Sequence, residues 1–170
     1  GDLLVVTSSQ LYLIDVANQA ITGNVSLIYQ SNWENYAVAV NPAGTTAYVT
    51  NKAESILQTY TLSSMANAGN MSTGTYSPFD VDISSDGSFG VIGYDEDVVQ
   101  VFQTSGLSVN ATYSANTVRA QVELNSDDSE VYIGAFRVGN GFTHVDFQTG
   151  VTTSYSSDYG STLGLYELDD

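Results

Sequence analysis

The sequence contains no cysteine, and only three of its 170 residues, Lys52, Arg119 and Arg137, are lysine or arginine. The lack of cysteine excludes disulfides, a thiolate nucleophile and cysteine-based zinc, haem or iron–sulfur sites. Three basic residues stand against 19 acidic ones, which gives a net charge of −16. This balance excludes nucleic acid as a partner, because binding it requires Lys and Arg to neutralise phosphates. The same charge repels anionic membrane surfaces and attracts cations.

Proline and long apolar runs are also scarce. The chain has 2 prolines, and no apolar run approaches the ~20 residues of a membrane-spanning helix, so we expect no direct insertion into a membrane. The length suits a single domain over residues 1–170. The chain begins with Gly1 and shows no signal peptide, so we expect a processed chain or a piece of a longer one.

What the sequence does contain is strand-like runs separated by turns, most clearly in residues 77–103. Three apolar residues alternate with two aspartates over residues 79–83, which is the period-2 pattern of a strand with one apolar face. Residues 84–87, Ser-Ser-Asp-Gly, predict a turn, because Ser and Asp bond their own backbone and Gly accepts a positive φ. Residues 89–94 and 98–102 predict two further strands, so the segment is an antiparallel meander.

The meander recurs along the chain with a period of about 42 residues, the size of one β-propeller blade. Each unit has a fourth, more polar strand, which we expect to end in a tyrosine at Tyr76, Tyr113 or Tyr155. Residues 3–30 match only the second to fourth strands, at 3–7, 11–16 and 25–29. Residues 162–169 match only a first strand.

These matches predict an all-β fold, a β-propeller of four blades with four antiparallel strands each. One blade is expected to be composite, closed by the N- and C-termini, which satisfies two sheet edges that otherwise invite aggregation. The blades are expected at residues 1–30 with 162–170, at 36–77, at 78–114 and at 119–156.

Two motifs carry a family resemblance. Residues 48–51 read Tyr-Val-Thr-Asn in a predicted second strand, and residues 78–87 read Pro, alternating apolar residues, then Ser-Ser-Asp-Gly. The units resemble the repeats of the YVTN family of β-propellers, which are found in surface-layer and other cell-envelope proteins. The resemblance covers the whole chain and implies an extracellular or cell-surface location. The tetrapeptide has changed at residues 91–94 and 132–135, and the sheets are also similar to those of NHL, WD-type and lactonase propellers.

Catalytic motifs are lacking. The single histidine, His144, lies in a predicted strand with Asp146 on the same face, a setting more typical of a structural group than of a catalyst. The sequence has no Gly-x-Ser-x-Gly elbow, Walker loop or His-Glu-x-x-His pair. We therefore predict no catalytic residues and expect a protein that is not an enzyme.

Acidic residues recur at one position of the predicted first strands. Asp82, Glu123 and Glu167 occupy this position in three units, and Ala39 occupies it in the fourth. First strands line the channel of a propeller, so one interpretation is that the three carboxylates converge there and bind a divalent cation weakly. A hard cation such as Ca²⁺ fits oxygen-only ligands. The other interpretation is that these side chains tilt to solvent at the channel mouth.

Three N-glycosylation sequons are present, at Asn24, Asn70 and Asn110. All three fall at or just before the fourth strand of a unit, which is the outer, solvent-facing edge of a blade. We predict that they are glycosylated, and a glycan at that edge also blocks pairing between sheet edges.

Two functions are compatible with these features. The first is an extracellular or cell-surface structural or adhesion module, whose partners are other proteins or glycans at the cell surface or further copies of itself. The second is a lactonase-like hydrolase with a metal in the central channel. The sequence favours the first, because no general base, nucleophile or complete ligand set can be assembled from it.

Overall fold

The computed structural model describes residues 1–28, 37–116, 118–135 and 141–155. Within these ranges the chain is all β, with fifteen strands and no helix, and hence with no helix able to cross a membrane. The strands form four antiparallel sheets, one of three strands and three of four strands.

The sheets follow one another in sequence. The first sheet contains β1 (Asp2–Val6), β2 (Gln10–Asp15) and β3 (Ala20–Ser26). The second contains β4 (Val38–Val40), β5 (Thr46–Asn51), β6 (Ile56–Thr61) and β7 (Ala66–Ser72). The third contains β8 (Pro78–Ile83), β9 (Phe89–Tyr94), β10 (Val99–Gln103) and β11 (Ser108–Tyr113). The fourth contains β12 (Ala120–Leu124), β13 (Glu130–Ala135), β14 (Phe142–Asp146) and β15 (Thr152–Tyr155).

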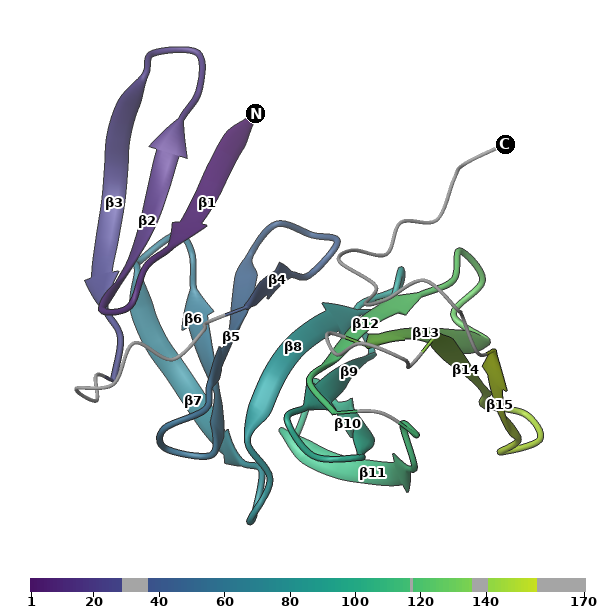
Figure 1. Cartoon of the computed structure of the whole chain (residues 1–170). Coiled ribbons are helices and arrows are strands. Elements are labelled where there is room, and N and C mark those ends of the chain that lie inside the picture. Colours follow the sequence, from purple (N-terminus) through teal and green to yellow (C-terminus); the bar gives the residue numbers. More distant parts are fainter. Residues whose placement is uncertain (29–36, 117, 136–140, 156–170) are drawn as a thin grey trace.

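The four sheets stand side by side along a curved row, from β1–β3 in purple to β12–β15 in green and yellow (Figure 1). Three hydrophobic clusters fill the spaces between consecutive sheets. One joins the first sheet to the second, one the second to the third, and one the third to the fourth. No cluster of the described residues joins the first sheet to the fourth. The described chain is thus a propeller-like arc.

The alternation of side chains across a strand explains why the inner sheets are apolar on both faces. In β5, Val49 packs toward the first sheet and Tyr48 packs toward the third. Tyr60 of β6 lies on the same side as Val49, and Leu57 lies on the same side as Tyr48. A sheet between two others therefore buries successive residues on opposite sides, and the Tyr-Val-Thr-Asn tetrapeptide of residues 48–51 belongs to such a strand.

The predicted meanders are confirmed, and their strand ends differ by one or two residues in most cases. Two predictions were wrong. The fourth strand of the second unit does not end at Tyr76, because β7 ends at Ser72 and Tyr76 packs instead against the core between the second and third sheets. The strand predicted at residues 25–29 is β3, Ala20–Ser26, because a tight turn with Gln19 at a positive φ of 53° starts the strand earlier.

The composite blade and the ring closure depend on residues 162–170, which lie outside the described residues. In the part of the chain that the structure describes, β1 has β2 as its neighbour and no strand on its other side. Closure of a four-bladed ring within one chain therefore stays a prediction.

Candidate functional site

Two aspartates tie the third sheet to the fourth at their inner strands, β8 and β12. The backbone N–H of Val122 donates to Oδ2 of Asp80 at 3.1 Å. The backbone N–H of Leu124 donates to Oδ2 of Asp82 at 2.8 Å. The two contacts lie one pleat apart along both strands, so the carboxylates form a short ladder between the sheets.

The same carboxylates also bind their own strand. Oδ1 of Asp80 accepts the N–H of Val81 at 3.0 Å, and Oδ1 of Asp82 accepts the N–H of Ile83 at 2.8 Å. Both β8 and β12 stand at the ends of their sheets. An edge strand presents N–H groups that no neighbouring strand accepts. Each aspartate therefore satisfies one such group on its own strand and one on the next sheet.

A third carboxylate extends the ladder at the turn after β12. Asp128 has a positive φ of 59°, in the conformation that Gly44 and Gly87 adopt in the corresponding turns, at 66° and 73°. Its carboxylate accepts the N–H of Ser85 at 2.9 and 3.0 Å and the Ser85 hydroxyl at 2.6 Å. A strained residue here replaces glycine and links the turn after β12 to the turn after β8.

The contact between the second and third sheets lacks this ladder. Ala37 and Ala39 occupy the positions in the second unit that Asp80 and Asp82 occupy in the third, and both pack against the hydrophobic cluster there. At the turn, a Cβ on Gly87 would come within 3.2 Å of Cδ of Pro42. At their inner strands and the turns that follow these strands, the second and third sheets are thus held by apolar packing, whereas the third and fourth add three carboxylate ties.

Burial raises the pKa of the Asp80 and Asp82 carboxyl groups, and this effect exceeds the opposing effect of the N–H bonds that the carboxylates accept. The charge of Asp82 adds to the raised pKa of Asp80, and that of Asp128 to the raised pKa of Asp82. The ladder therefore concentrates negative charge where it is partly shielded from water.

The raised pKa values predict how a neutral replacement of Asp80 responds to pH. The folded protein binds the protons of the Asp80 and Asp82 carboxyl groups more tightly than the unfolded chain does, so protonation of these groups stabilises the fold. This stabilisation is complete below the unfolded pKa, about 4. It is lost as the pH rises through the raised folded pKa values. Asp80→Asn lacks the contribution of the Asp80 proton. It also puts an N–H₂ group where a carboxylate oxygen accepted a hydrogen bond, which should lower the free energy of unfolding by about 1–3 kcal/mol.

We therefore expect Asp80→Asn to be less stable than the wild type at every pH, and the deficit to be larger at pH 4 than at pH 7. Urea unfolding at the two pH values measures it. Ala37→Ser, at the equivalent position of the second sheet, is the control and should show one small, pH-independent change. A deficit of Asp80→Asn that grows toward neutral pH contradicts the assignment of the raised pKa.

Asp128 allows a prediction that separates backbone strain from the tie to Ser85. Asp128→Gly loses the tie but relieves the positive φ, so the two effects offset and the stability should change by less than about 1 kcal/mol. Asp128→Ala loses the tie and keeps the strain, so it should cost about 1–3 kcal/mol. Thermal unfolding of both variants measures the difference, and equal stabilities of the two would show that strain at this turn contributes nothing.

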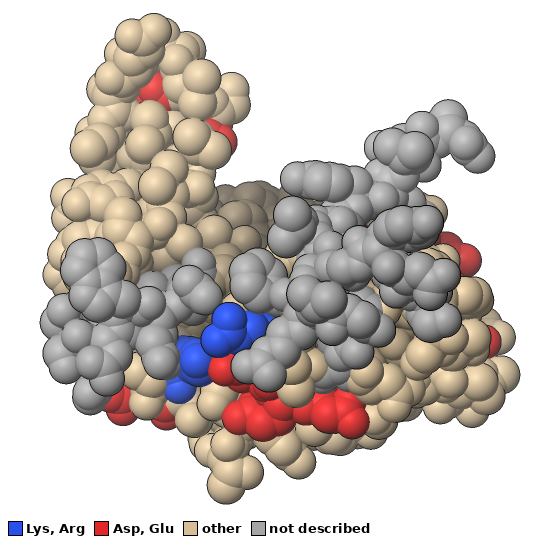
Figure 2. Space-filling view, viewed as in Figure 1, with Lys and Arg blue, Asp and Glu red and all other residues tan. Residues whose placement is uncertain are grey.

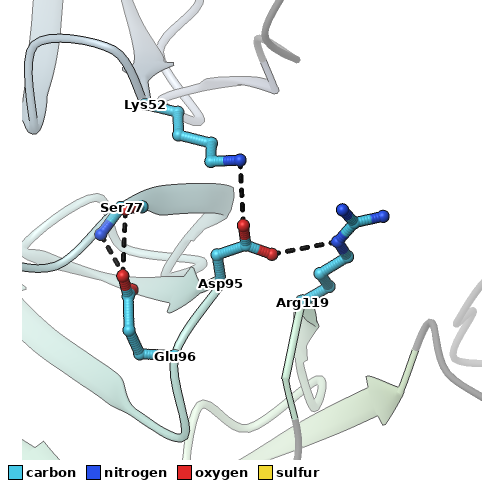
Figure 3. A network of polar contacts seen from close by, with 5 residues as sticks. All are labelled: Lys52, Ser77, Asp95, Glu96 and Arg119. Atoms are coloured by element: carbon cyan, nitrogen blue, oxygen red, sulfur yellow. Dashed lines mark hydrogen bonds and ion pairs between the residues drawn. The ribbon is translucent and has the colours of Figure 1, made fainter.

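Three sheets also meet in a salt-bridge network, at the turns that follow β5 and β9 and at the residue before β12 (Figure 3). Asp95, after β9, pairs with Nζ of Lys52 at 2.9 Å and with Nε of Arg119 at 3.1 Å. Lys52 follows β5 and Arg119 precedes β12, so the carboxylate connects the second, third and fourth sheets. Beside it, Glu96 accepts the N–H and the hydroxyl of Ser77 at 2.8 and 2.9 Å.

The network uses both basic residues that the structure describes. Figure 2 shows their atoms gathered beside a group of Asp and Glu atoms on this face. Since Arg137 lies outside the described residues, the cations in the described ranges are both engaged in holding sheets together. Local sequence patterning carries no signal for this network, because Lys52 lies 43 residues before Asp95 and Arg119 lies 24 residues after it.

The predicted channel residues are only partly placed. Both carboxylate oxygens of Asp82 accept hydrogen bonds from backbone N–H groups. Glu123 lies half-buried on β12, opposite Tyr132 of β13. Glu167 lies outside the described residues. Within those residues no group of three or more His, Cys, Asp or Glu side chains is close enough to hold a metal. The Ca²⁺ site of Asp82, Glu123 and Glu167 therefore stays a prediction, and what the structure shows for Asp82 is a tie between sheets.

The other singled-out residues lie as follows. Asn24, Asn70 and Asn110 are exposed on β3, β7 and β11, the outermost strands of their sheets. This position suits a glycan acceptor, and glycosylation itself stays a prediction.

His144 lies on β14 among aromatic rings, with Tyr132 and Tyr155 at 6.0 and 5.7 Å between ring centroids. No described serine or threonine is hydrogen-bonded to it in the structure.

A pocket of about 570 Å³ opens between the first and second sheets. Its lining is mostly apolar, with Leu4, Leu13, Val40 and Leu62, and Asp2 is the charged residue among the lining side chains. Ligand sites in proteins combine an apolar lining with a few converging polar groups. The lining also includes the hydroxyl side chains of Thr45 and Ser63.

Comparison with known proteins supports the architecture. No protein-family model and no curated protein matches the sequence. Among solved structures, the chain is similar to Kuenenia stuttgartiensis hydrazine synthase, with a TM-score of 0.77 at 17% identity. The likeness shows the fold alone. The alignment covers 91% of this chain and 46% of that chain, so this chain spans less than half of its neighbour's length.

Proposed function

We propose that the protein is an extracellular or cell-surface structural or adhesion module built on β-propeller blades. The observation that carries the proposal is that its acidic and basic side chains bind groups on neighbouring sheets. Asp80, Asp82, Asp128 and Asp95 bind backbone or side-chain groups of neighbouring sheets. These ties make a rigid platform, and they leave the described side chains without a set suited to catalysis.

Two further features support the cell-surface location. The exposed sequon asparagines Asn24, Asn70 and Asn110 stand on outer strands, where a glycan has room. The resemblance of residues 48–51 and 78–87 to the YVTN repeats of cell-envelope proteins points the same way. The proposed partners are other proteins or glycans at the surface, because a strongly acidic chain is unsuited to nucleic acid or anionic lipid.

The lactonase-like alternative needs a metal held by side chains of the inner strands. Asp82 is the described member of that predicted set whose bonds are known, and both of its oxygens already accept backbone N–H groups. The structural module is therefore the preferred proposal.

Two measurements on natively purified material test the proposal. Brief protease treatment of intact source cells, followed by peptide mapping, should release peptides of this protein and show glycans on Asn24, Asn70 or Asn110. The purified protein should hydrolyse no lactone of a chemically varied set, with or without millimolar Ca²⁺. Protection of the protein in intact cells together with three unmodified asparagines would overturn the location, and Ca²⁺-dependent lactone hydrolysis would overturn the function.

A further inference from the structure

The two end sheets of the arc each have one face that no cluster of the described residues covers. In the interior of the arc every face is covered, because consecutive sheets share a hydrophobic cluster. We name the face of the first sheet that points away from the second sheet the leading face. The face of the fourth sheet that points away from the third sheet is the trailing face.

The leading face is apolar at positions that are buried elsewhere. It consists of Leu3, Val5, Tyr12, Ile14 and Val16, in which Leu3 pairs with Ile14 and Val5 with Tyr12 across β1 and β2. In the second sheet, the positions equivalent in strand pairing lie on β5, on β6 and at the residue after β6. They are Ala47, Val49, Gln58, Tyr60 and Leu62. All five of those residues are buried beneath the first sheet. In contrast, Leu3 and Val16 are 51% and 53% exposed.

The trailing face carries a row of aromatic rings beside three acidic residues, Glu123, Glu130 and Asp146. Phe142 of β14 stacks on Tyr155 of β15, with 4.5 Å between ring centroids and 14° between planes. His144 and Tyr132 continue the row on β14 and β13, at the centroid distances given above. Phe142 and Tyr155 are 40% and 44% exposed. Aromatic side chains grouped on an exposed face are typical of protein interfaces.

The trailing face repeats the register of the interior contacts. Phe142 pairs with Tyr155 as Val99 pairs with Tyr113 in the third sheet and as Leu57 pairs with Met71 in the second. Val99, Leu57 and Met71 are buried against the following sheet. The fourth sheet thus presents, at the same positions, the kind of surface on which the next sheet of the arc packs.

We propose that a second copy of this chain docks by its leading face on the trailing face of the first copy. One chain carries both halves of the contact. Its leading face has the same register as the face by which an interior sheet packs on the preceding sheet, and its trailing face has the same register as the face by which an interior sheet packs on the following sheet. Two copies can therefore cover all four end faces through two equivalent contacts related by a two-fold axis. The proposal rests on the proposed function in that it names the partner of the same structural module.

The oligomeric state of the whole chain tests the proposal directly. Sedimentation velocity between about 1 and 100 µM should show a species with the mass of two chains that grows with concentration. Larger oligomers that the face variants described below abolish would support the same contact. A single-chain mass throughout would overturn the proposal, and closure within one chain would then account for the two faces.

Variants on the two faces identify the contact. Val16→Asp on the leading face and Phe142→Asp on the trailing face should each raise the dissociation constant at least about tenfold. Val109→Asp is the matched control, because Val109 is 41% exposed on β11 of the third sheet, away from both end faces. Leu3→Ser and Tyr155→Ser are milder versions, and circular dichroism with urea unfolding checks that every variant is folded.

Mixing provides the sharpest result. Val16→Asp keeps an intact trailing face and Phe142→Asp keeps an intact leading face, so an equimolar mixture should form one intact contact per pair of chains. Complexes should appear in the mixture under conditions where each variant alone stays monomeric. A mixture that stays monomeric, or variants that assemble as the wild type does, would overturn the proposal.

Charge gives an independent readout. Each chain carries a net charge of −16, so two copies repel one another and salt should strengthen an apolar contact. We expect the dissociation constant to fall several-fold between about 0.05 and 0.5 M NaCl. A rise instead would show that charge pairs hold the copies together and would overturn the apolar contact.

The failures of the two proposals can be told apart. A chain that is monomeric in solution but released from the cell surface by protease leaves the proposed function standing and removes the second copy. A chain that assembles through the two faces but is protected in intact cells keeps the contact and removes the proposed location.

Discussion

Phe102→Ala is expected to lower the free energy of unfolding by about 3–5 kcal/mol, the range for deleting a fully buried aromatic ring. Phe102 of β10 is completely buried between the second and third sheets. Its ring lies 5.9 Å from that of Tyr48 between centroids, at an interplanar angle of 54°. Loss of the ring leaves a cavity between the second and third sheets. Each of these sheets also packs on a further sheet, so neither can move in to fill the cavity.

Equilibrium unfolding in urea measures this cost, with Val151→Ala as the control. Val151 is 54% exposed in the turn before β15, so its truncation should change the stability by less than about 0.5 kcal/mol. A cost for Phe102→Ala as small as that of the control would mean that the second and third sheets do not pack as described.

Gly90 makes the test of Phe102 more specific. A Cβ on Gly90 would lie 2.6 Å from the Phe102 ring and 2.7 Å from Cδ1 of Ile83, so the ring fills the space that Gly90 leaves open. We expect Gly90→Ala to destabilise the wild type and to cost clearly less in the Phe102→Ala background, where the remaining obstacle is the terminal methyl group of Ile83. Additive effects in this double-mutant cycle would contradict the contact.

Gly93→Ala is expected to cost about 3 kcal/mol, which corresponds to a fall in melting temperature of about 6–12 °C for a chain of this size. A Cβ on Gly93 would come within 2.1 Å of the carbonyl oxygen of Ala120 and within 3.0 Å of Cγ1 of Val122. The obstacle is the backbone of β12, which cannot rotate away as a side chain can. β12 would have to shift, and the bond from the Val122 N–H to Asp80 would lengthen.

Gly106→Ala is the matched control for Gly93→Ala, because the nearest atom to its added Cβ is the Ser108 hydroxyl at 3.8 Å. Differential scanning calorimetry of the two variants and the wild type measures the effects. Similar melting temperatures for Gly93→Ala and Gly106→Ala would show that β9 and β12 are further apart than described.

The equivalent of Gly93 in the second sheet is Thr50 of the Tyr-Val-Thr-Asn tetrapeptide. The Thr50 hydroxyl accepts the N–H of Ala37 at 2.9 Å, so a side chain fits there. At Gly93 the next sheet approaches too closely for any side chain. The change of the tetrapeptide to Val-Ile-Gly-Tyr at residues 91–94 therefore has a structural cause that the sequence alone does not reveal.

The sequence by itself determined the strands, the turns and their repetition. Alternation in residues 79–83 and the Ser-Ser-Asp-Gly turn act over a few neighbouring residues, so local patterning specifies them and the same unit forms wherever the pattern recurs. The exposed positions of Asn24, Asn70 and Asn110 followed from the same patterning, because the polar fourth strand of each unit is its outer edge.

Only the tertiary structure decided what the acidic residues do. The sequence aligned Asp82 with Glu123 and suggested a shared cation, but the partner of Asp82 is the backbone N–H of Leu124, a group that every residue other than proline carries. No residue pattern marks which N–H groups an edge strand leaves open. The close approach of β12 to Gly93 and the two uncovered end faces are likewise set by how sheets about one repeat apart pack on each other. That packing depends on shape complementarity between distant segments, which local alternation does not encode.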